Sequence, residues 1–141
     1  MKKLLLVLTL AGSTLANSAD TVQRRVQTMD VPRYPPLATV ANVAGTVSLS
    51  IEVDAEGQVT KATALSGHRM LQESAAENVK SWRFIKSLDG IPSKVTVTYE
   101  YQIQGVVYSD QVWSPRIILD LPTKVTIIAP GRIIDTNSAK P

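Results

Sequence analysis

The sequence predicts an α+β fold, a three-stranded antiparallel sheet with two helices packed on it, plus a C-terminal extension of short strands. Residues 47–53 and 59–65 alternate apolar and polar side chains on either side of a glycine turn, which predicts a β-hairpin. Residues 70–84 carry a helical apolar stripe, and residues 95–103 alternate again. Because the apolar face of a sheet must be buried, we expect the helices to cover it.

A proline-rich segment opens the domain. Residues 31–36 read Val-Pro-Arg-Tyr-Pro-Pro. Each proline fixes its own φ and keeps the preceding residue out of the helical region, so the segment is predicted to be extended. Pro36 suits the first turn of a short helix over residues 37–43, because its missing N–H is not needed there. Gly45 is the expected anchor that ends this helix.

The predicted hairpin has one buried and one exposed face. Its first strand places four apolar residues at every second position, namely Val47, Leu49, Ile51 and Val53. The turn reads Asp-Ala-Glu-Gly, and Gly57 is available for a positive φ. The second strand alternates more weakly and is expected to return antiparallel to the first.

The clearest predicted helix covers residues 70–84. Leu71, Ala75, Val79 and Trp82 recur at helical spacing and form one apolar stripe. Trp82 and Phe84 are the largest side chains in this region. We therefore expect Leu71, Trp82 and Phe84 to anchor the helix on the sheet.

The third alternating segment is a candidate binding strand. It contains no proline and has five apolar residues on one face, Val95, Val97, Tyr99, Tyr101 and Ile103. If this strand lies at a sheet edge, its unpaired backbone groups could accept an extended peptide as an added strand. Residues 105–141 are predicted to form a β-rich extension with short strands near residues 117–121 and 125–128. This extension could instead cover the edge, or pair two copies of the chain.

The N-terminus is typical of an exported protein. Lys2 and Lys3 precede a short apolar run and two small-residue sites, which predicts a signal peptide over residues 1–19 that is cleaved near position 16 or 19. The run is shorter than the roughly 20 apolar residues of a spanning helix, although an uncleaved segment would leave an inner-membrane anchor. Residues 20–30 are polar and are predicted to be a flexible leader. Without the two lysines, basic and acidic residues nearly balance, so nucleic acid is not an expected partner.

The sequence offers little for catalysis. His68 is the single histidine and the chain has no cysteine, so neither a nucleophile–base pair nor the usual zinc ligand set can be assembled. His68 is predicted to be a turn residue near a helix start. Asp54 and Glu56 resemble part of a calcium loop but lack its other ligands. We expect no enzyme activity, metal or cofactor, and therefore a role in protein binding.

Several spaced motifs resemble the TonB C-terminal domain family. Residues 31–38, V-P-R-Y-P-P-L-A, resemble its P-x-Y-P-x-x-A opening, and residues 54–59, D-A-E-G-Q-V, resemble its D-x-x-G-x-V turn. The S-G-H and W-R-F segments around the predicted helix, at residues 66–68 and 82–84, match in the same order. Residues 90–92 resemble the G-x-P that precedes its last strand. The resemblance covers about residues 31–103, and we take residues 31–104 as the domain.

The resemblance implies a function in the periplasm. Members of this family bind the TonB box of outer-membrane receptors by strand addition and pass on energy from a proton-driven inner-membrane complex. By carry-over, Arg33, Tyr34 and Pro35 would lie near the receptor contact, and residues 95–103 would be the pairing strand. Val31 and Arg69 depart from the family pattern, which has Gln and Pro there. The hypotheses are a periplasmic binding module, a membrane-anchored energy transducer with an uncleaved N-terminus, and a structural or self-associating protein of the cell envelope. In the third, the tail strands close the sheet edge or pair two copies as a homodimer.

Overall fold

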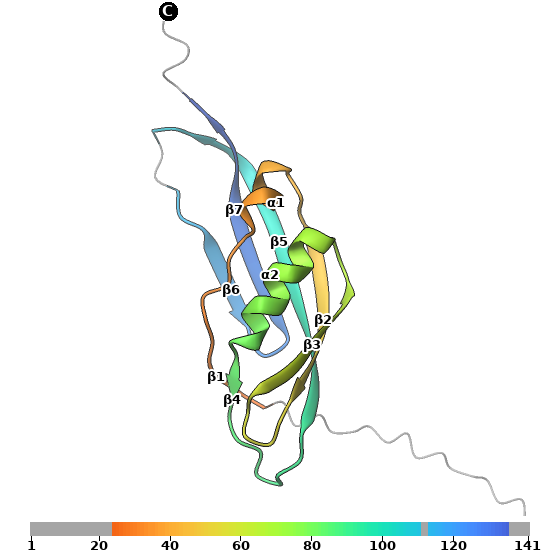
Figure 1. The fold of residues 1–141 in the computed structure, drawn as a ribbon. Helices are drawn as coiled ribbons and strands as arrows, with labels where there is room; N and C mark the ends of the chain where they lie inside the picture. Colours follow the sequence, from red (N-terminus) through yellow and green to blue (C-terminus); the bar gives the residue numbers. More distant parts are fainter. Residues whose placement is uncertain (1–23, 111–112, 136–141) are drawn as a thin grey trace, which may run out of the picture.

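The computed structural model describes residues 24–110 and 113–135 (Figure 1). The predicted signal peptide and the first residues of the predicted leader lie outside the described residues. The strands and helices follow one another as β1 Val26–Thr28, α1 Pro36–Val40, β2 Gly45–Val53, β3 Val59–Ser66, α2 Arg69–Lys80, β4 Arg83–Phe84, β5 Ser93–Tyr108, β6 Arg116–Asp120 and β7 Lys124–Ile134. The predicted α+β class and its two helices are confirmed.

The main sheet has five strands in the order β3-β2-β5-β7-β6, so the predicted three-stranded antiparallel sheet is wrong in its extent. The β2–β3 and β2–β5 pairs are antiparallel, as expected. The extension adds β7, which runs parallel to β5, and then β6, which runs antiparallel to β7. The extension joins this sheet because Val125 and Ile127 are apolar residues that bury completely, at 0% and 1% exposure, against the domain core.

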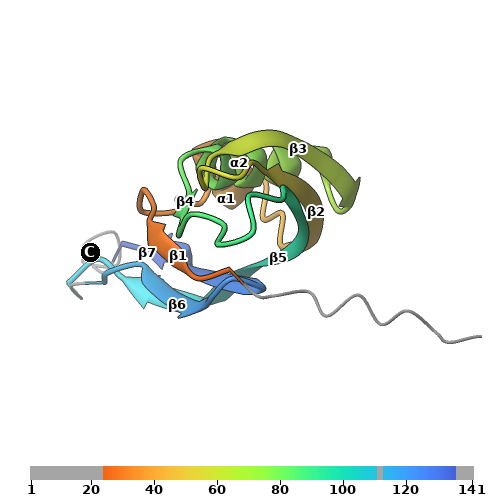
Figure 2. The same ribbon diagram turned by 90° about the horizontal axis from the view of Figure 1, so that it is seen from below.

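The sheet curves around α2 (Figure 2), and the buried side chains of the core fill its concave side. The inward face of β2 is buried completely, through Val47, Leu49, Ile51 and Val53. The helix contributes Leu71, Ala75 and Val79 from the predicted stripe. Alternation in the strands and the helical spacing in α2 therefore converge on one core, as the patterns predicted.

The predicted helix is shorter than expected at its C-terminal end. It ends at Lys80, where the Ser81 N–H donates to the carbonyl of Asn78 and the Trp82 N–H donates to the carbonyl of Val79. Trp82 follows the helix, and Phe84 lies in β4. Both rings are nevertheless buried, with centroids 6.0 Å apart. Trp82 and Phe84 are core anchors, as predicted, but they reach the core from the segment after the helix.

Two glycines predicted as anchors have different surroundings. Gly57 has φ +92°, and a Cβ there would lie 2.0 Å from the carbonyl oxygen of Phe84, so both the turn and the close approach of β4 require glycine. Gly45 has φ +143°, but an added Cβ would meet nothing within 4 Å. Gly45 is the first residue of β2. Glycine suits this position because of its positive φ, not because a side chain would lack space.

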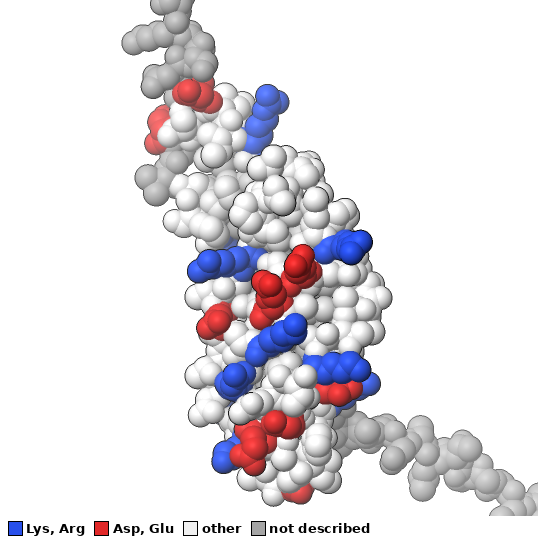
Figure 3. Space-filling model, in the orientation of Figure 1, with Lys and Arg blue, Asp and Glu red and all other residues white. Residues whose placement is uncertain are grey.

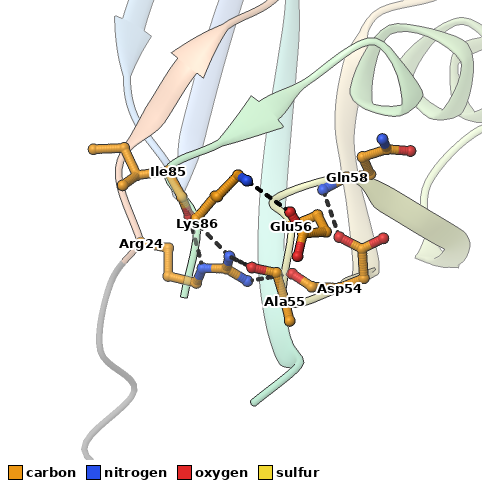
Figure 4. Close-up of polar contacts among 7 residues, drawn as sticks. All are labelled: Arg24, Asp54, Ala55, Glu56, Gln58, Ile85 and Lys86. Carbon is orange, nitrogen blue, oxygen red and sulfur yellow. Dashed lines mark hydrogen bonds and ion pairs between the residues drawn. The ribbon is translucent and has the colours of Figure 1, made fainter. Parts of the chain in front are cut away.

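Residues 24–30 are part of the fold, which corrects their prediction as a flexible leader. β1 pairs antiparallel with β4, with Val26 opposite Phe84. Arg24 is 8% exposed, and its guanidinium donates to the carbonyl oxygens of Asp54 at 2.7 Å, Ala55 at 3.2 Å and Ile85 at 2.8 Å (Figure 4). The same arginine donates to Ser93 Oγ at 3.4 Å. The hydrogen bonds of the buried Arg24 guanidinium thus connect the N-terminal segment to the hairpin turn and to the segment after β4.

Candidate functional site

The proline-rich segment is fixed on the domain by Tyr34. Its hydroxyl donates to the carbonyl oxygen of Val43 at 2.6 Å. Its ring meets the ring of Tyr101 edge-on, with centroids 5.1 Å apart and planes at 80°. Burial raises the pKa of Tyr34 above its usual value. The tyrosine predicted to lie near a partner is therefore also the link between residues 31–36 and β5.

The same segment is hydrogen-bonded to α2. Ser74 Oγ donates to the carbonyl oxygen of Arg33 at 3.0 Å, and Asn78 Nδ2 donates to that of Asp30 at 2.9 Å. The Asp30 N–H donates to Ser81 Oγ at 3.0 Å. These bonds hold the backbone of the segment against the helix and leave the Arg33 side chain exposed.

A groove of about 1050 Å³ lies between the proline-rich segment with α1 on one side and strands β6 and β7 on the other. Its lining is mostly apolar and comes from two parts of the chain that are far apart in sequence. The lining residues are Val31, Pro32, Arg33, Tyr34, Pro36, Thr39, Val40, Asn42, Pro115, Ile117, Ile127, Ala129, Pro130, Gly131, Arg132 and Ile133.

The charged residues that line the groove are both basic. Arg33 and Arg132 are its two charged lining residues, and no Asp or Glu belongs to the lining. Elsewhere the face that carries α2 shows Lys and Arg mixed with Asp and Glu, and the region over α1 is mostly uncharged (Figure 3). Both groove arginines are exposed, and Val31, Val40 and Ile133 expose 70%, 86% and 64% of their surface. An apolar groove with two cations suits an extended ligand that carries apolar side chains and an anionic group.

The predicted pairing strand is not a free edge in this structure. β7 pairs with β5 from Thr98 opposite Lys124 to Tyr108 opposite Ile134. The expected edge is therefore occupied over most of residues 95–103, because the extension brings its own strand there. The side chains of Val95, Val97, Tyr99 and Tyr101 lie in the core, at 0–6% exposure, and Ile103 is half-buried. A partner strand could pair with the backbone of this strand only in place of β7, and it could not contact those four side chains.

Two glycines allow the close approach of β5 and β7. Gly105 has φ +62° and lies at the point where the β5–β7 register passes from Gln104 to Val106. A Cβ on Gly131 would lie 1.7 Å from the carbonyl oxygen of Gly105. The parallel pairing of the two strands therefore depends on the absence of a side chain at position 131.

Asn78 joins α2 to β5 through the core tyrosines. Its Oδ1 accepts hydrogen bonds from Tyr99 Oη at 2.7 Å and from Trp82 Nε1 at 3.2 Å. Burial raises the pKa of Tyr99 well above its usual value. Burial also raises the pKa of Tyr101 to about 12. The Tyr101 hydroxyl is buried without a hydrogen-bond partner among the described residues.

His68 has a structural role. It caps the N-terminus of α2, where Nδ1 accepts from the Met70 N–H at 3.3 Å, as its prediction near a helix start suggested. Asp54 Oδ1 accepts from the Gln58 N–H at 2.8 Å within the hairpin turn, and Glu56 pairs with Lys86 at 3.0 Å. Within residues 24–110 and 113–135, no three His, Cys, Asp or Glu residues are grouped to hold a metal ion.

Comparison with known proteins identifies the family. The sequence model described as "Gram-negative bacterial TonB protein C-terminal" matches residues 30–104. The chain belongs to this family. The Vibrio cholerae protein TonB is 35% identical over 79 residues, which cover 52% of this chain and 32% of that protein. The Xanthomonas campestris protein TonB is 40% identical over 58 residues, which cover 40% of this chain and 26% of that protein.

The matches cover only part of each curated relative. The chain spans about a third or less of the length of the curated TonB relatives it matches. The solution NMR structure of the Pseudomonas aeruginosa TonB CTD aligns with a TM-score of 0.49 and 20% identity, over 57% of this chain and 87% of that one.

No helix in residues 24–110 and 113–135 is long and apolar enough to span a bilayer.

Sequence reasoning found one wall of the groove and missed the other. Arg33, Tyr34 and Pro35 were predicted from the family motif, and of these Arg33 and Tyr34 line the groove. The opposite wall, with Ile117, Ala129 and Arg132, belongs to the extension beyond the matched region. The signal for that wall was the alternation near residues 117–128, which predicted strands but not their neighbours. Arg24 and Asn78 were also missed, because a lone polar residue gives no periodic signal.

Proposed function

We propose that this chain is a periplasmic binding module of TonB-dependent transport, which recognises an extended segment of an outer-membrane receptor, the TonB box, rather than an enzyme. One observation supports this most: in a TonB C-terminal family domain, the groove opens beside Arg33 and Tyr34, where the family resemblance puts the receptor contact. Pro35 lies in the same segment and shapes its path. The signal peptide at residues 1–19 would deliver the module to the periplasm.

The ligand follows from the groove. Apolar side chains of an extended peptide would pack on Val31, Val40 and Ile133, which are exposed now. A carboxylate on the peptide would bind Arg33 or Arg132 through charge-assisted hydrogen bonds. A short segment that makes about five hydrogen bonds of roughly 0.5–1.5 kcal/mol each, less the cost of ordering it, would bind reversibly with micromolar affinity.

Strand addition at residues 95–103 is the second binding mode. β7 already forms a parallel pair with β5 from Thr98 onward, so this mode requires β7 to leave. A receptor segment would then take the place of β7 along the same backbone groups. Peptide binding in the groove leaves β7 where it is, and the two modes therefore differ in whether the extension moves.

The test is isothermal titration calorimetry of the purified chain with a receptor TonB-box peptide that carries one acidic residue. We expect micromolar binding, with a loss of about tenfold when the acidic residue is replaced by its amide. The double variant R33A/R132A should show a similar loss, and R25A, an exposed arginine away from the groove, should bind normally. Absence of binding by the unaltered chain would refute the module hypothesis.

The membrane-anchored transducer is the alternative, and it concerns the same domain. Mass spectrometry of the chain from the periplasm decides between the two. A mature N-terminus at Asn17 or Asp20 supports the exported module. A chain that keeps Met1 and fractionates with the inner membrane supports the anchored transducer.

A further inference from the structure

Strand β6 leaves one edge of the five-stranded sheet open. It is the last strand in the order β3-β2-β5-β7-β6, and no described strand pairs with its outer side (Figures 1 and 2). Ile118 and Leu119 on this strand expose 50% and 48% of their surface. An edge with exposed apolar side chains is a template for another strand.

The sequence of β6 is complementary to itself in one arrangement. It reads Arg-Ile-Ile-Leu-Asp from Arg116 to Asp120. In an antiparallel pair of two such strands centred on Ile118, each Arg116 lies opposite Asp120 of the other copy. Ile117 lies opposite Leu119, and Ile118 lies opposite itself. Every cross-strand pair is then either oppositely charged or apolar, which is the pattern that stabilises a sheet.

The two charges are available for this pairing. Arg116 and Asp120 are exposed, and neither forms an ion pair with another described residue. The β6–β7 register puts Lys124 opposite Asp120, but the ammonium of Lys124 pairs with Glu100 at 2.6 Å. Each strand thus offers one cation and one anion, separated by four residues, to a strand that runs the opposite way.

The same charges select the register. A parallel copy in register would put arginine opposite arginine and aspartate opposite aspartate, which is destabilising. Pro115 precedes the strand, and Pro122 follows it by two residues, so pairing cannot extend far at either end. The other sheet edge, β3, carries Lys61 as its one charged residue and lacks this symmetry. The charges of β6 and the prolines around it therefore disfavour pairing with most other strand edges. They favour pairing with β6 of a second copy.

We propose that two copies of this chain associate through β6 in an antiparallel, two-fold symmetric pair centred on Ile118, which joins their sheets into one. Such an interface is isologous, because each copy presents the same surface. A five-residue strand buries far less than the area of a standard interface, so the dimer forms and dissociates with concentration. The proposal concerns the extension and stands apart from ligand binding in the groove.

The test is sedimentation velocity on the full chain over a concentration series, without any peptide. The unaltered chain should show a concentration-dependent monomer–dimer equilibrium. R116D puts aspartate opposite Asp120, and D120R puts arginine opposite Arg116, so each single variant should dimerise about tenfold more weakly. Each single variant leaves the rest of β6 unchanged. K61D, which lies on the β3 edge, is the matched control and should dimerise normally.

Restoration of the charge pairs separates this proposal from a folding defect. The double variant R116D/D120R exchanges the two charges and should dimerise like the unaltered chain. An equimolar mixture of R116D with D120R should form a heterodimer, because the two variants then complement each other at both ends. A chain that stays monomeric at all concentrations, or a dimer that none of these substitutions weakens or restores, would overturn the proposal.

Discussion

The ring of Tyr34 stands edge-on against the ring of Tyr101, with the ring centroids 5.1 Å apart. This contact joins the proline-rich segment to the middle of β5, two parts of the chain 67 positions apart in sequence. The Tyr34 hydroxyl also holds the carbonyl oxygen of Val43, just after α1. One side chain therefore sets the position of a groove wall relative to the sheet.

Replacing Tyr34 by phenylalanine tests the hydrogen-bonded part of this link. The ring contact with Tyr101 stays, but the Val43 carbonyl loses its donor, so we expect about 1 kcal/mol lower free energy of unfolding. Urea denaturation followed by tryptophan fluorescence measures the change. A Y34A variant, which also loses the ring contact, should be less stable than Y34F; equal stabilities would show that the ring contact contributes nothing.

The neighbouring core tyrosines should respond in opposite ways to loss of their hydroxyls. Y99F removes the hydrogen bond at 2.7 Å to Asn78 and should destabilise the fold by about 1 kcal/mol. Y101F removes a buried hydroxyl without a described partner, so its stability should be unchanged or higher by up to about 1 kcal/mol. Chemical denaturation at pH 7 compares the two, and a larger loss for Y101F than for Y99F would contradict the structure.

The fold should lose stability in alkali. Burial raises the pKa of Tyr101 in the fold to about 12, above the value of about 10 in the unfolded chain. The folded state thus favours the neutral phenol: its contribution is complete below pH 10 and is lost as pH rises from 10 toward 12, by about 1.4 kcal/mol per pH unit. Thermal unfolding between pH 8 and 12 measures this loss. Y101F should show a shallower decline, and identical profiles would contradict the assignment to Tyr101.

The buried guanidinium of Arg24 should matter far more than its position near the N-terminus suggests. R24A leaves the carbonyl oxygen of Ile85 without its donor, leaves that of Asp54 with the Gly57 N–H alone, and loosens β1, so we expect a loss of about 2–3 kcal/mol. R25A is the matched control, because Arg25 is exposed and its backbone carbonyl, which the substitution keeps, accepts a hydrogen bond from the Ile85 N–H just after β4. Differential scanning calorimetry of the two variants should show a lower Tm for R24A; similar Tm values would mean that the anchor is dispensable.

A side chain at position 131 should open the edge of β5. G131A places a Cβ against the backbone of Gly105, so β7 must shift away from β5 while the β2–β5 pairing stays. Amide hydrogen exchange should then increase in residues 124–134 and on β5 beyond Thr98, but not in β2. If strand addition is the binding mode, G131A should bind the receptor peptide more tightly than the unaltered chain. If the groove is the binding site, the peptide should bind more weakly.

Much of the fold was predictable because local patterns carry it. Val47 to Val53 and Leu71 to Val79 bury the faces that their periods of 2 and 3.6 residues predicted. The family motif predicted that Tyr34 lies near a partner, and in the structure Tyr34 lines the groove. The partners of Arg24 could not be predicted, since a single cation in a polar segment gives no period and finds its carbonyls only when distant turns meet.

The sequence alone determined which segments are strands and helices, which faces are apolar, and the family of residues 30–104. Tertiary structure decided that β7 lies beside β5, that the groove has a second wall from the extension, and that β6 is left at the edge. The physical reason is that periodicity reports how one strand is buried but not which strand lies next to it. Strand order depends on contacts between residues far apart in the chain, such as the approach of Gly131 to Gly105.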